Sequence, residues 1–343
     1  MRTEIATLGE FGLINRLTKD IKLTQPTSVK GVGDDAAIID NKNKRTLVAT
    51  DLLLEGIHFD LTYFPLKHLG YKAAVINFSD IFAMNGKPQQ ITVSLGISKR
   101  FSVEDIEDFY DGVKLACKIY NVDIVGGDTA SSLTGFTVSI TCIGIANDED
   151  IIYRNGAKDT DLICVSGDLG AAYMGLQLLE REKAVFAGQE DFTPDFSGKE
   201  YLLERQLKPE ARKDIMEELS KLDITPTSMI DISDGLSSDL LHICSQSNVG
   251  CRVFEERLPI DYQTAMMAES FNLNVATVAL NGGEDYEMLF TVSLSVYEQV
   301  KTVPGIHLIG HITDASLESK FVTRDGHEMM LEAQGWSTNE TNY

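Results

Sequence analysis

Apolar stretches that end on an aspartate recur along this chain, and they restrict its fold more than any other feature. The first is Gly-Val-Gly-Asp-Asp-Ala-Ala at residues 31–37, where two adjacent carboxylates follow a pair of glycines and lead into an apolar run. The pattern returns at Leu47–Asp51, Ile124–Asp128 and Met229–Asp234. Glycines allow a tight backbone path beside a buried strand, and like charges this close repel unless a cation shares them. The pattern therefore predicts an acidic site built from several strand ends.

Length and charge limit the domain number and the partners. With 343 residues the chain is long enough for two domains. The polar run Asn147–Asp150 marks the predicted boundary, with one domain over residues 1–147 and a second over residues 148–343. The net charge of -22 argues against nucleic acid or an anionic membrane as a partner, because both require a basic surface. Solubility accounts for most of this acidity, since only a few carboxylates can belong to one site.

Targeting and cysteine patterns favour a cytoplasmic protein. Residues 1–11 contain no apolar segment of the kind found in secretory signals. The longest uncharged stretch, Thr129–Asn147, is rich in Ser, Thr and Gly and alternates like a strand, so it predicts sheet and not a membrane span. The five cysteines form no Cys-x-x-Cys pair, and we expect them to be reduced core residues.

Hydrophobic periodicity predicts helices and strands that interleave without a strict βαβ rhythm, which favours the α+β class. We expect helices over Gly9–Lys22, Leu69–Met84, Ser102–Tyr120, Pro209–Leu222 and Ser237–Ser247. We expect strands over Ala37–Asp40, Thr46–Ala49, Ile91–Ile97, Val122–Val125, Phe136–Ile145, Leu162–Ser166, Met229–Ile232 and Glu287–Val292. Gly126–Thr129 is expected to be a glycine-rich strand exit. Lys183–Lys199 predicts a surface loop, and its role as a lid or a plain insertion stays open.

The candidate metal ligands are six aspartates at element ends or on polar faces: Asp35, Asp51, Asp80, Asp128, Asp231 and Asp234. Carboxylate oxygens suit Mg²⁺, which keeps waters and binds substrate phosphates. A turn or helix cap explains any one of them more simply, whereas the whole set favours a metal site. A dinucleotide fingerprint at Gly31–Ala36 is disfavoured, because two acids lie where a pyrophosphate must approach. A Ca²⁺ loop starting at Asp231 would have His242 at its twelfth position, so that pattern also fails.

Three further side chains have both a functional and a structural interpretation. Arg154 is the candidate to neutralise a phosphate, or it is an ordinary surface arginine. His58 follows a predicted strand and is either a site residue or a loop histidine without a role. Trp336, the only tryptophan, covers either a core edge or an aromatic ligand ring.

Several motifs together resemble a known enzyme family. They are Gly-Val-Gly-Asp-Asp-Ala-Ala (31–37), Ala-Thr-Asp (49–51), Asn-Phe-Ser-Asp with Ala-Met (77–84), Val-Gly-Gly-Asp-Thr (125–129), Ile-Asp-Ile-Ser-Asp-Gly-Leu (230–236) and Gly-Gly-Glu-Asp-Tyr-Glu (282–287). In this order they resemble the thiamine-monophosphate kinase family, within the aminoimidazole ribonucleotide synthetase superfamily. The match extends from about Gly9 to Trp336, which makes it more specific than any single motif.

The resemblance implies ATP-dependent phosphorylation of thiamine monophosphate to thiamine diphosphate, by direct in-line transfer with several Mg²⁺ ions. It implies a homodimer formed through the sheet of an N-terminal Mg/ATP-binding domain, and a C-terminal α+β domain that completes the site. The implied metal ligands are Asp35, Thr50, Asp51, Asp80, Asp128, Asp231 and Asp234. The implied ATP contacts are Tyr120, Gly127, Asp128, Arg154 and Ser233. The implied contacts to thiamine monophosphate are His58, Glu284 and Trp336.

Ala49 departs from the family, whose members often have a hydroxyl residue there that helps to hold a metal. Two other functions remain alternatives. One is another ATP-using activity of the superfamily, similar to aminoimidazole ribonucleotide synthetase. The other is a non-catalytic nucleotide-binding regulator, which would be expected to have lost part of the acidic set. No general base is expected, because an acceptor that is already a phosphate is ionised near neutral pH.

Overall fold

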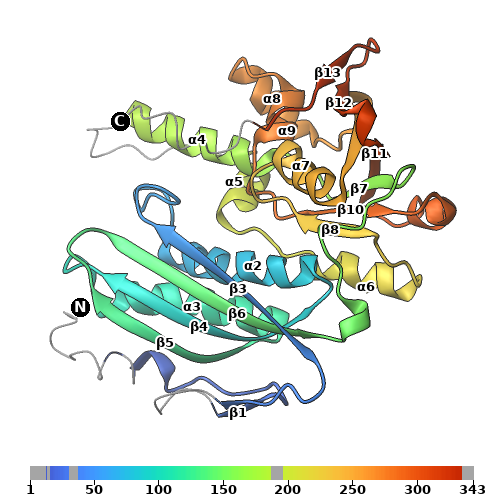
Figure 1. Ribbon diagram of the computed structural model, residues 1–343. Coiled ribbons are helices and arrows are strands. Elements are labelled where there is room, and N and C mark those ends of the chain that lie inside the picture. The colour runs from blue at the N-terminus through green and yellow to red at the C-terminus, as the bar shows by residue number, and fades with distance from the viewer. Residues whose placement is uncertain (1–12, 14–15, 31–37, 187–195, 334–343) are drawn as a thin grey trace. The chain divides into compact units, whose positions relative to one another are not determined.

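The computed structural model describes residue 13 and residues 16–30, 38–186 and 196–333. These residues form two compact units that divide between Ile151 and Ile152, close to the predicted boundary. Each unit has its own sheet and its own helices (Figure 1). The functional roles assigned to the two halves stay predictions.

The first unit is built on a four-stranded sheet that helices cover on one face (Figure 1). Its strands are β3 (Arg45–Leu54), β4 (Lys87–Ile97), β5 (Asp123–Ser131) and β6 (Phe136–Ala146). The order β3-β6-β4-β5 places β3 and β5 at opposite edges, and β4 and β5 are the parallel pair. The covering helices are α2 (Leu66–Ala83) and α3 (Val103–Tyr120). A separate ribbon pairs β1 (Ser28–Lys30) with β2 (Ile38–Ile39), and η1 (Asp148–Asp150) is a 3₁₀ turn.

Local sequence explains where α3 begins and how closely it approaches α2. Ser102 and Asp105 form the expected capping box, in which each side chain accepts a hydrogen bond from the backbone amide of the other. The expected apolar stripe is buried at Ile106, Phe109, Val113, Cys117 and Tyr120. The two helices meet at Gly70 and Gly112. A Cβ atom on Gly112 would lie 1.9 Å from the carbonyl oxygen of Lys67, so a larger residue would force the helices apart.

The face of this sheet opposite the helices carries small polar and aliphatic side chains. On β3, the positions that alternate with buried Leu47 are exposed, with Val48 at 65% and Leu52 at 52%. The half-buried outward positions of β6 are Thr137, Ser139, Thr141 and Ile143. The described part of the first unit therefore presents an accessible sheet face with a partly apolar surface.

The second unit contains a seven-stranded mixed sheet in the order β13-β12-β9-β11-β7-β10-β8. Its strands are β7 (Leu162–Ser166), β8 (Ser228–Asp231), β9 (Val249–Phe254), β10 (Met288–Val292), β11 (Ile306–Asp314), β12 (Ser319–Val322) and β13 (Glu328–Met330). Its helices are α4 (Ala171–Phe186), α5 (Glu200–Leu207), α6 (Lys213–Lys221), α7 (Leu236–Ser247), α8 (Tyr262–Ser270), α9 (Val275–Asn281) and α10 (Tyr297–Val300). Three 3₁₀ turns are η2 (Glu255–Arg257), η3 (Leu294–Val296) and η4 (Ala315–Leu317).

Two apolar clusters hold the second unit together. The larger one packs α7 and α9 against the sheet, with Leu240 and Ala279 against strand residues such as Val165 and Leu289. The smaller one joins α4, α5, α8 and α9 through residues that include Leu178. All of these named side chains are fully buried, so each cluster contributes to the stability of the unit through removal of apolar surface from water.

The α+β class with mixed sheets is confirmed, and β7 has the bounds that the sequence predicts. Two expectations were wrong in detail. The segment Gly126–Thr129 continues β5 to Ser131, because it pairs with β4. Helix α6 begins at Lys213 and not at Pro209, and α5 was not predicted.

Within the described residues, no helix combines the length and the apolar character that crossing a membrane requires. All five cysteines lie in this part of the chain, and all five are buried free thiols, as expected. Burial raises the pKa of the Cys164 thiol above its ordinary value. Such a thiol stays protonated and behaves as a small apolar core residue.

Candidate functional site

The candidate ligands of the first unit lie on opposite edges of its sheet. Asp51 is at the middle of β3, and Gly127 and Asp128 are on β5. The register connects Asp51 to Gly127 through Ile140 and Val93, so both lie in one row across the four strands. Three strand spacings of ~4.8 Å place the two edges on the order of 14 Å apart. One ion cannot bridge Asp51 and Asp128 of the same copy across that distance.

Two further candidate ligands of the first unit, Thr50 and Asp80, differ in exposure. Thr50 is exposed, and its hydroxyl lies 3.0 Å from the hydroxyl of Thr141 on β6. Asp80 is half-buried on α2. Burial raises the pKa of Cys142 on β6, and the negative charge of Asp80 adds to the increase. Asp80 is therefore close to the β6 strand on the helix-covered face of the sheet.

Tyr120, an expected nucleotide contact, is 7% exposed at the end of α3. Its ring centroid lies 5.4 Å from that of Phe78 and 6.2 Å from that of Phe82, both on α2. Beside the β5 glycines the structure contains a cavity of about 50 Å³, lined in part by Gly127, Asp128 and Tyr110. A cavity of this size can hold ordered water.

His58 lies in the exposed loop after β3. Its Nδ1 accepts a hydrogen bond from the backbone amide of Leu54 at 3.1 Å. In the neutral imidazole this contact leaves the proton on Nε2, which can donate to a ligand. Arg154 is exposed, and the backbone carbonyl of the preceding Tyr153 accepts from the amide of Met229, which attaches this segment to β8.

The second unit gathers its acids at the end of β8. Asp231 is 4% exposed as the last residue of the strand, and Ser233 and Asp234 follow in an exposed turn. The backbone amides of Ser233 and Asp234 donate to Oδ2 of Asp239 at 3.1 and 3.2 Å. Burial raises the pKa of Asp239 to about 7, and the charges of Asp231 and Asp234 contribute. Like charges this close favour a proton or a cation between them.

The turn that carries Glu284 lies against this acidic turn. The amide of Glu284 donates to the carbonyl of Ser233 at 2.7 Å, and the amide of Tyr286 donates to the carbonyl of Ile232 at 2.8 Å. The strands β8 and β10 are neighbours, and this explains why residues more than fifty positions apart meet here. The half-buried carboxylate of Glu284 accepts from Nε2 of Gln206 at 2.9 Å. Ser233, Asp234 and Glu284 are thus brought together.

Asp35 and Trp336 lie outside the described residues. Among the residues that are described, no three His, Cys, Asp or Glu side chains converge as they would around a metal ion held by protein ligands alone. The roles assigned to the individual site residues stay predictions.

Comparison with known proteins assigns the chain to a family. Residues 33–146 match the family model described as AIR synthase related protein, N-terminal domain. The thiamine-monophosphate kinase of Aquifex aeolicus is 36% identical over 284 residues, which are 83% of this chain and 86% of that relative. The thiamine-monophosphate kinase of Bacillus subtilis is 32% identical over 339 residues, 96% and 99% of the two chains. The chain belongs to the thiamine-monophosphate kinase family.

The fold gives the same result. The solved structure of AaThiL complexed with AMPPCP and TMP superposes with a TM-score of 0.73 at 33% identity, and the match covers 98% of both chains. The expected family resemblance is therefore confirmed, and the chain is a kinase of the thiamine-monophosphate kinase family.

The donor set of this kinase fits Mg²⁺. The turn after β8 offers the carboxylates of Asp231 and Asp234 beside a third acid, Asp239, whose pKa is raised by burial and by both neighbours. Mg²⁺ is usually bound through one or two carboxylates together with waters and substrate phosphates. Two carboxylates from this turn are therefore enough for this ion, and the oxygen-only chemistry disfavours softer metals.

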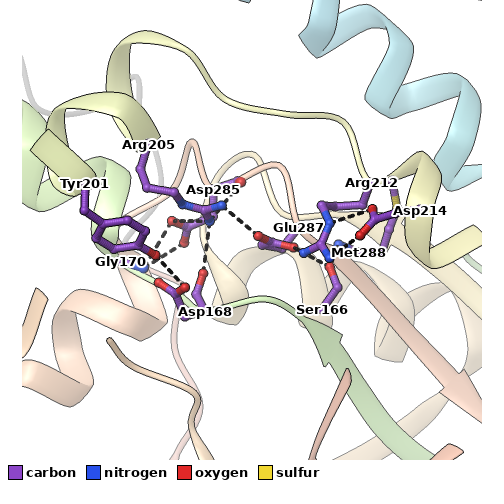
Figure 2. A network of polar contacts seen from close by, with 10 residues as sticks. All are labelled: Ser166, Asp168, Gly170, Tyr201, Arg205, Arg212, Asp214, Asp285, Glu287 and Met288. Carbon is purple, nitrogen blue, oxygen red and sulfur yellow. Dashed lines mark hydrogen bonds and ion pairs between the residues drawn. The ribbon is translucent and has the colours of Figure 1, made fainter. Parts of the chain in front are cut away.

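A buried network of arginines and carboxylates behind the Glu284 turn was missed by sequence reasoning (Figure 2). Arg205 of α5 donates to Oε1 of Glu287 at 2.8 Å, and Arg212 and Ser166 both contact Oε2 of Glu287. The backbone amide of Gly170 donates to both carboxylate oxygens of Asp285, at 3.1 and 2.9 Å. The available signal was the acid pair at residues 285 and 287, directly before the apolar strand residues 288–290.

Proposed function

We propose that this protein transfers the γ-phosphoryl group of ATP to the phosphate of thiamine monophosphate, which gives thiamine diphosphate. The observation that carries the proposal is the similarity to thiamine-monophosphate kinases over nearly the full length, including a relative whose solved complex contains AMPPCP and TMP. The acidic turn after β8 supports it, because closely spaced carboxylates suit a cation that accompanies phosphates.

The proposal includes Mg²⁺ and specific residue roles. Mg²⁺, when bound, would neutralise the phosphate charges that repel one another during the transfer. The proposed metal ligands are Asp35, Thr50, Asp51, Asp80, Asp128, Asp231 and Asp234. The proposed nucleotide contacts are Tyr120, Gly127, Asp128, Arg154 and Ser233. The proposed contacts to thiamine monophosphate are His58, Glu284 and Trp336.

The chain itself must hold and orient the two substrates for in-line attack. The acceptor phosphate has a second pKa of about 6, so it is largely ionised at neutral pH and needs no general base. His58 can donate from Nε2, because its Nδ1 is already occupied by the amide of Leu54. The carboxylate of Glu284 is held by Gln206 and can accept from a donor or attract a cationic ring.

We further propose a homodimer that forms through the accessible sheet face of the first unit. Val48 and Leu52 are more than half exposed on that face, and the hydroxyls of Thr50 and Thr141 lie beside them. Within the described residues, β3 and β5 are unpaired on their outer edges. Open edges and an apolar face are features that a second copy can cover.

The first test is ADP formation by the purified protein with ATP, Mg²⁺ and thiamine monophosphate. ADP that depends on the substrate and is abolished by EDTA, with thiamine diphosphate as the second product, supports the proposal. ATP turnover without thiamine diphosphate contradicts it and indicates another activity of the superfamily. Nucleotide binding without any turnover favours the regulator.

Substitution of the aspartates tests the residue roles. Asp51→Asn and Asp128→Asn should each lower turnover strongly while thermal unfolding stays close to that of the wild type. Asp108→Asn is a matched control, because Asp108 is an exposed residue of α3 and is not one of the proposed ligands. Near wild-type kinetics for both site variants would contradict the metal assignment.

A further inference from the structure

The backbone at Glu284 is held in an unusual conformation. The φ angles of Gly283, Glu284 and Tyr286 are 69°, 57° and 51°, in the left-handed region that non-glycine residues rarely adopt. Two non-glycine residues in this region within three positions need surroundings that fix them. A Cβ on Gly283 would lie 2.8 Å from the carbonyl oxygen of Ser233, so the two turns are also in close contact.

Two carboxylates fix this turn from behind. Asp285 and Glu287 are each 1% exposed, and Figure 2 shows both directed toward Arg205. The guanidinium of Arg205 lies 2.8 Å from Glu287, and it also donates to the backbone carbonyls of Asp168 at 3.1 Å and Asp285 at 3.4 Å. Arg212 binds the other oxygen of Glu287. Arg205 of α5 and Arg212, directly before α6, therefore hold the turn through the buried carboxylates.

Gln206, the residue after Arg205, contacts the half-buried side chain of Glu284 in the same turn. Gln206 is 2% exposed, and its Nε2 donates to Oε2 of Glu284 at 2.9 Å. The carboxylate requires a donor at this position, which fixes the orientation of the amide. Adjacent residues of α5 thus contact both sides of one turn: Arg205 the buried acids, and Gln206 the half-exposed carboxylate.

We propose that Gln206 is a positioning residue that orients the Glu284 carboxylate toward thiamine monophosphate, from a helix that Arg205 anchors to the same turn. The proposal deepens the proposed function and rests on it. Gln206 does not need to touch the substrate. Its contribution is to restrict the rotamers of a carboxylate that would otherwise lose conformational entropy on binding.

The test is a double-mutant cycle in steady-state kinetics with Gln206→Ala and Glu284→Gln. Gln206→Ala should raise the KM for thiamine monophosphate about tenfold, the scale of a hydrogen bond to a charged group. The KM for ATP should stay within about twofold, because the effect is confined to one substrate contact. In the Glu284→Gln background, Gln206→Ala should have little further effect. Gln206→Glu, which keeps the size but replaces the donor by a second acid, should raise the KM more than Gln206→Ala.

The control is Gln246→Ala, at an exposed position of α7, which should leave both KM values unchanged. Calorimetric titration with thiamine monophosphate provides a readout apart from turnover and should show the same coupling. Additive effects of the two substitutions, or equal increases in both KM values, would overturn the positioning role while the kinase function stands. A wild-type protein without substrate-dependent turnover or binding would overturn the proposed function, and this inference with it.

Discussion

Replacement of Arg205 by methionine should lower stability more than the same replacement of an exposed arginine does. The side chain of Arg205 is 16% exposed, and it is paired with Glu287 and Asp285, which are almost completely buried. Burial alone would lower the pKa of Arg205, but these carboxylates and Asp168 outweigh it, so its pKa is raised above the ordinary value. Methionine has a similar length and fills the space without the charge, which isolates the electrostatic part of the loss.

The magnitude follows from the charges left behind. Removal of one partner from a buried ion pair typically costs about 3–5 kcal/mol, because the other charge stays buried without compensation. Here Arg212 remains on Glu287, whereas Asp285 loses its arginine partner and keeps the hydrogen bonds from the backbone amide of Gly170 (Figure 2). For a unit of this size, about 2–4 °C per kcal/mol gives a Tm lower by roughly 6–20 °C.

The assay is thermal unfolding followed by circular dichroism, with urea unfolding to obtain free energies. Arg45→Met is the matched control, because Arg45 pairs with Asp148 at 2.7 Å while both side chains are more than 60% exposed. That pair should contribute less than about 1 kcal/mol. Arg205→Lys should give an intermediate loss, since an ammonium keeps the charge but not the forked geometry. A loss for Arg205→Met no larger than that for Arg45→Met would refute the reasoning.

Three other predictions concern stability. Gly127→Ala should destabilise the first unit by about 1–3 kcal/mol, because the new Cβ would lie 2.0 Å from the carbonyl oxygen of Val93. Thermal unfolding measures the loss, and Gly126→Ala is the control, because its new Cβ would have its nearest contact at 3.5 Å. Burial raises the pKa of Asp285 from 3.8 to about 7, so the folded state binds more protons between these values and stability should fall as pH rises from about 4 to 7. In urea unfolding, Asp285→Asn should reduce this slope without abolishing it, because burial also raises the pKa of Asp239 to about 7. Ser102→Ala should cost about 1 kcal/mol in urea unfolding through loss of the α3 cap.

The sequence predicted elements whose signals are local. Helix α3 has its capping box and its apolar stripe within one segment, and β7 ends at Ser166, directly before Gly167 with a φ of 56°. Helix α5 was not found, because its buried residues are only Leu202 and Gln206 and give no periodic stripe. The extension of β5 through its glycines depends on pairing with β4, which is a non-local contact.

The candidate site was predictable to the extent that strand ends identify it. Asp231 and Glu284 could be associated because both flank predicted strands, and β8 and β10 are indeed neighbours. The arginines that bind Glu287 are 82 and 75 residues away, so no spacing in the sequence relates them. The order of strands in the sheet could not be read from the sequence, and this order places Asp51 and Asp128 on opposite edges.

That separation leads to a prediction about the proposed homodimer. Asp51 and Asp128 occupy the two edges of one sheet, on the order of 14 Å apart by three strand spacings. If both residues serve the same phosphates, we expect Asp51 of one copy to act together with Asp128 of a second copy, because the proposed dimer brings the two sheets together. Each site would then take its acids from two chains, and neither chain would be active alone.

Mixing two inactive variants distinguishes this arrangement from a site within one chain. Asp51→Asn and Asp128→Asn are purified separately, mixed under conditions that allow subunit exchange, and assayed for thiamine diphosphate. In a mixed dimer with shared sites, one site combines both substitutions and the other has neither. Random exchange should therefore restore about a quarter of the wild-type activity, since half of the dimers are mixed and each has one intact site of two. If each chain holds its own site, every site keeps one substitution and the mixture stays inactive, which would contradict the shared arrangement even when size-exclusion chromatography shows a dimer.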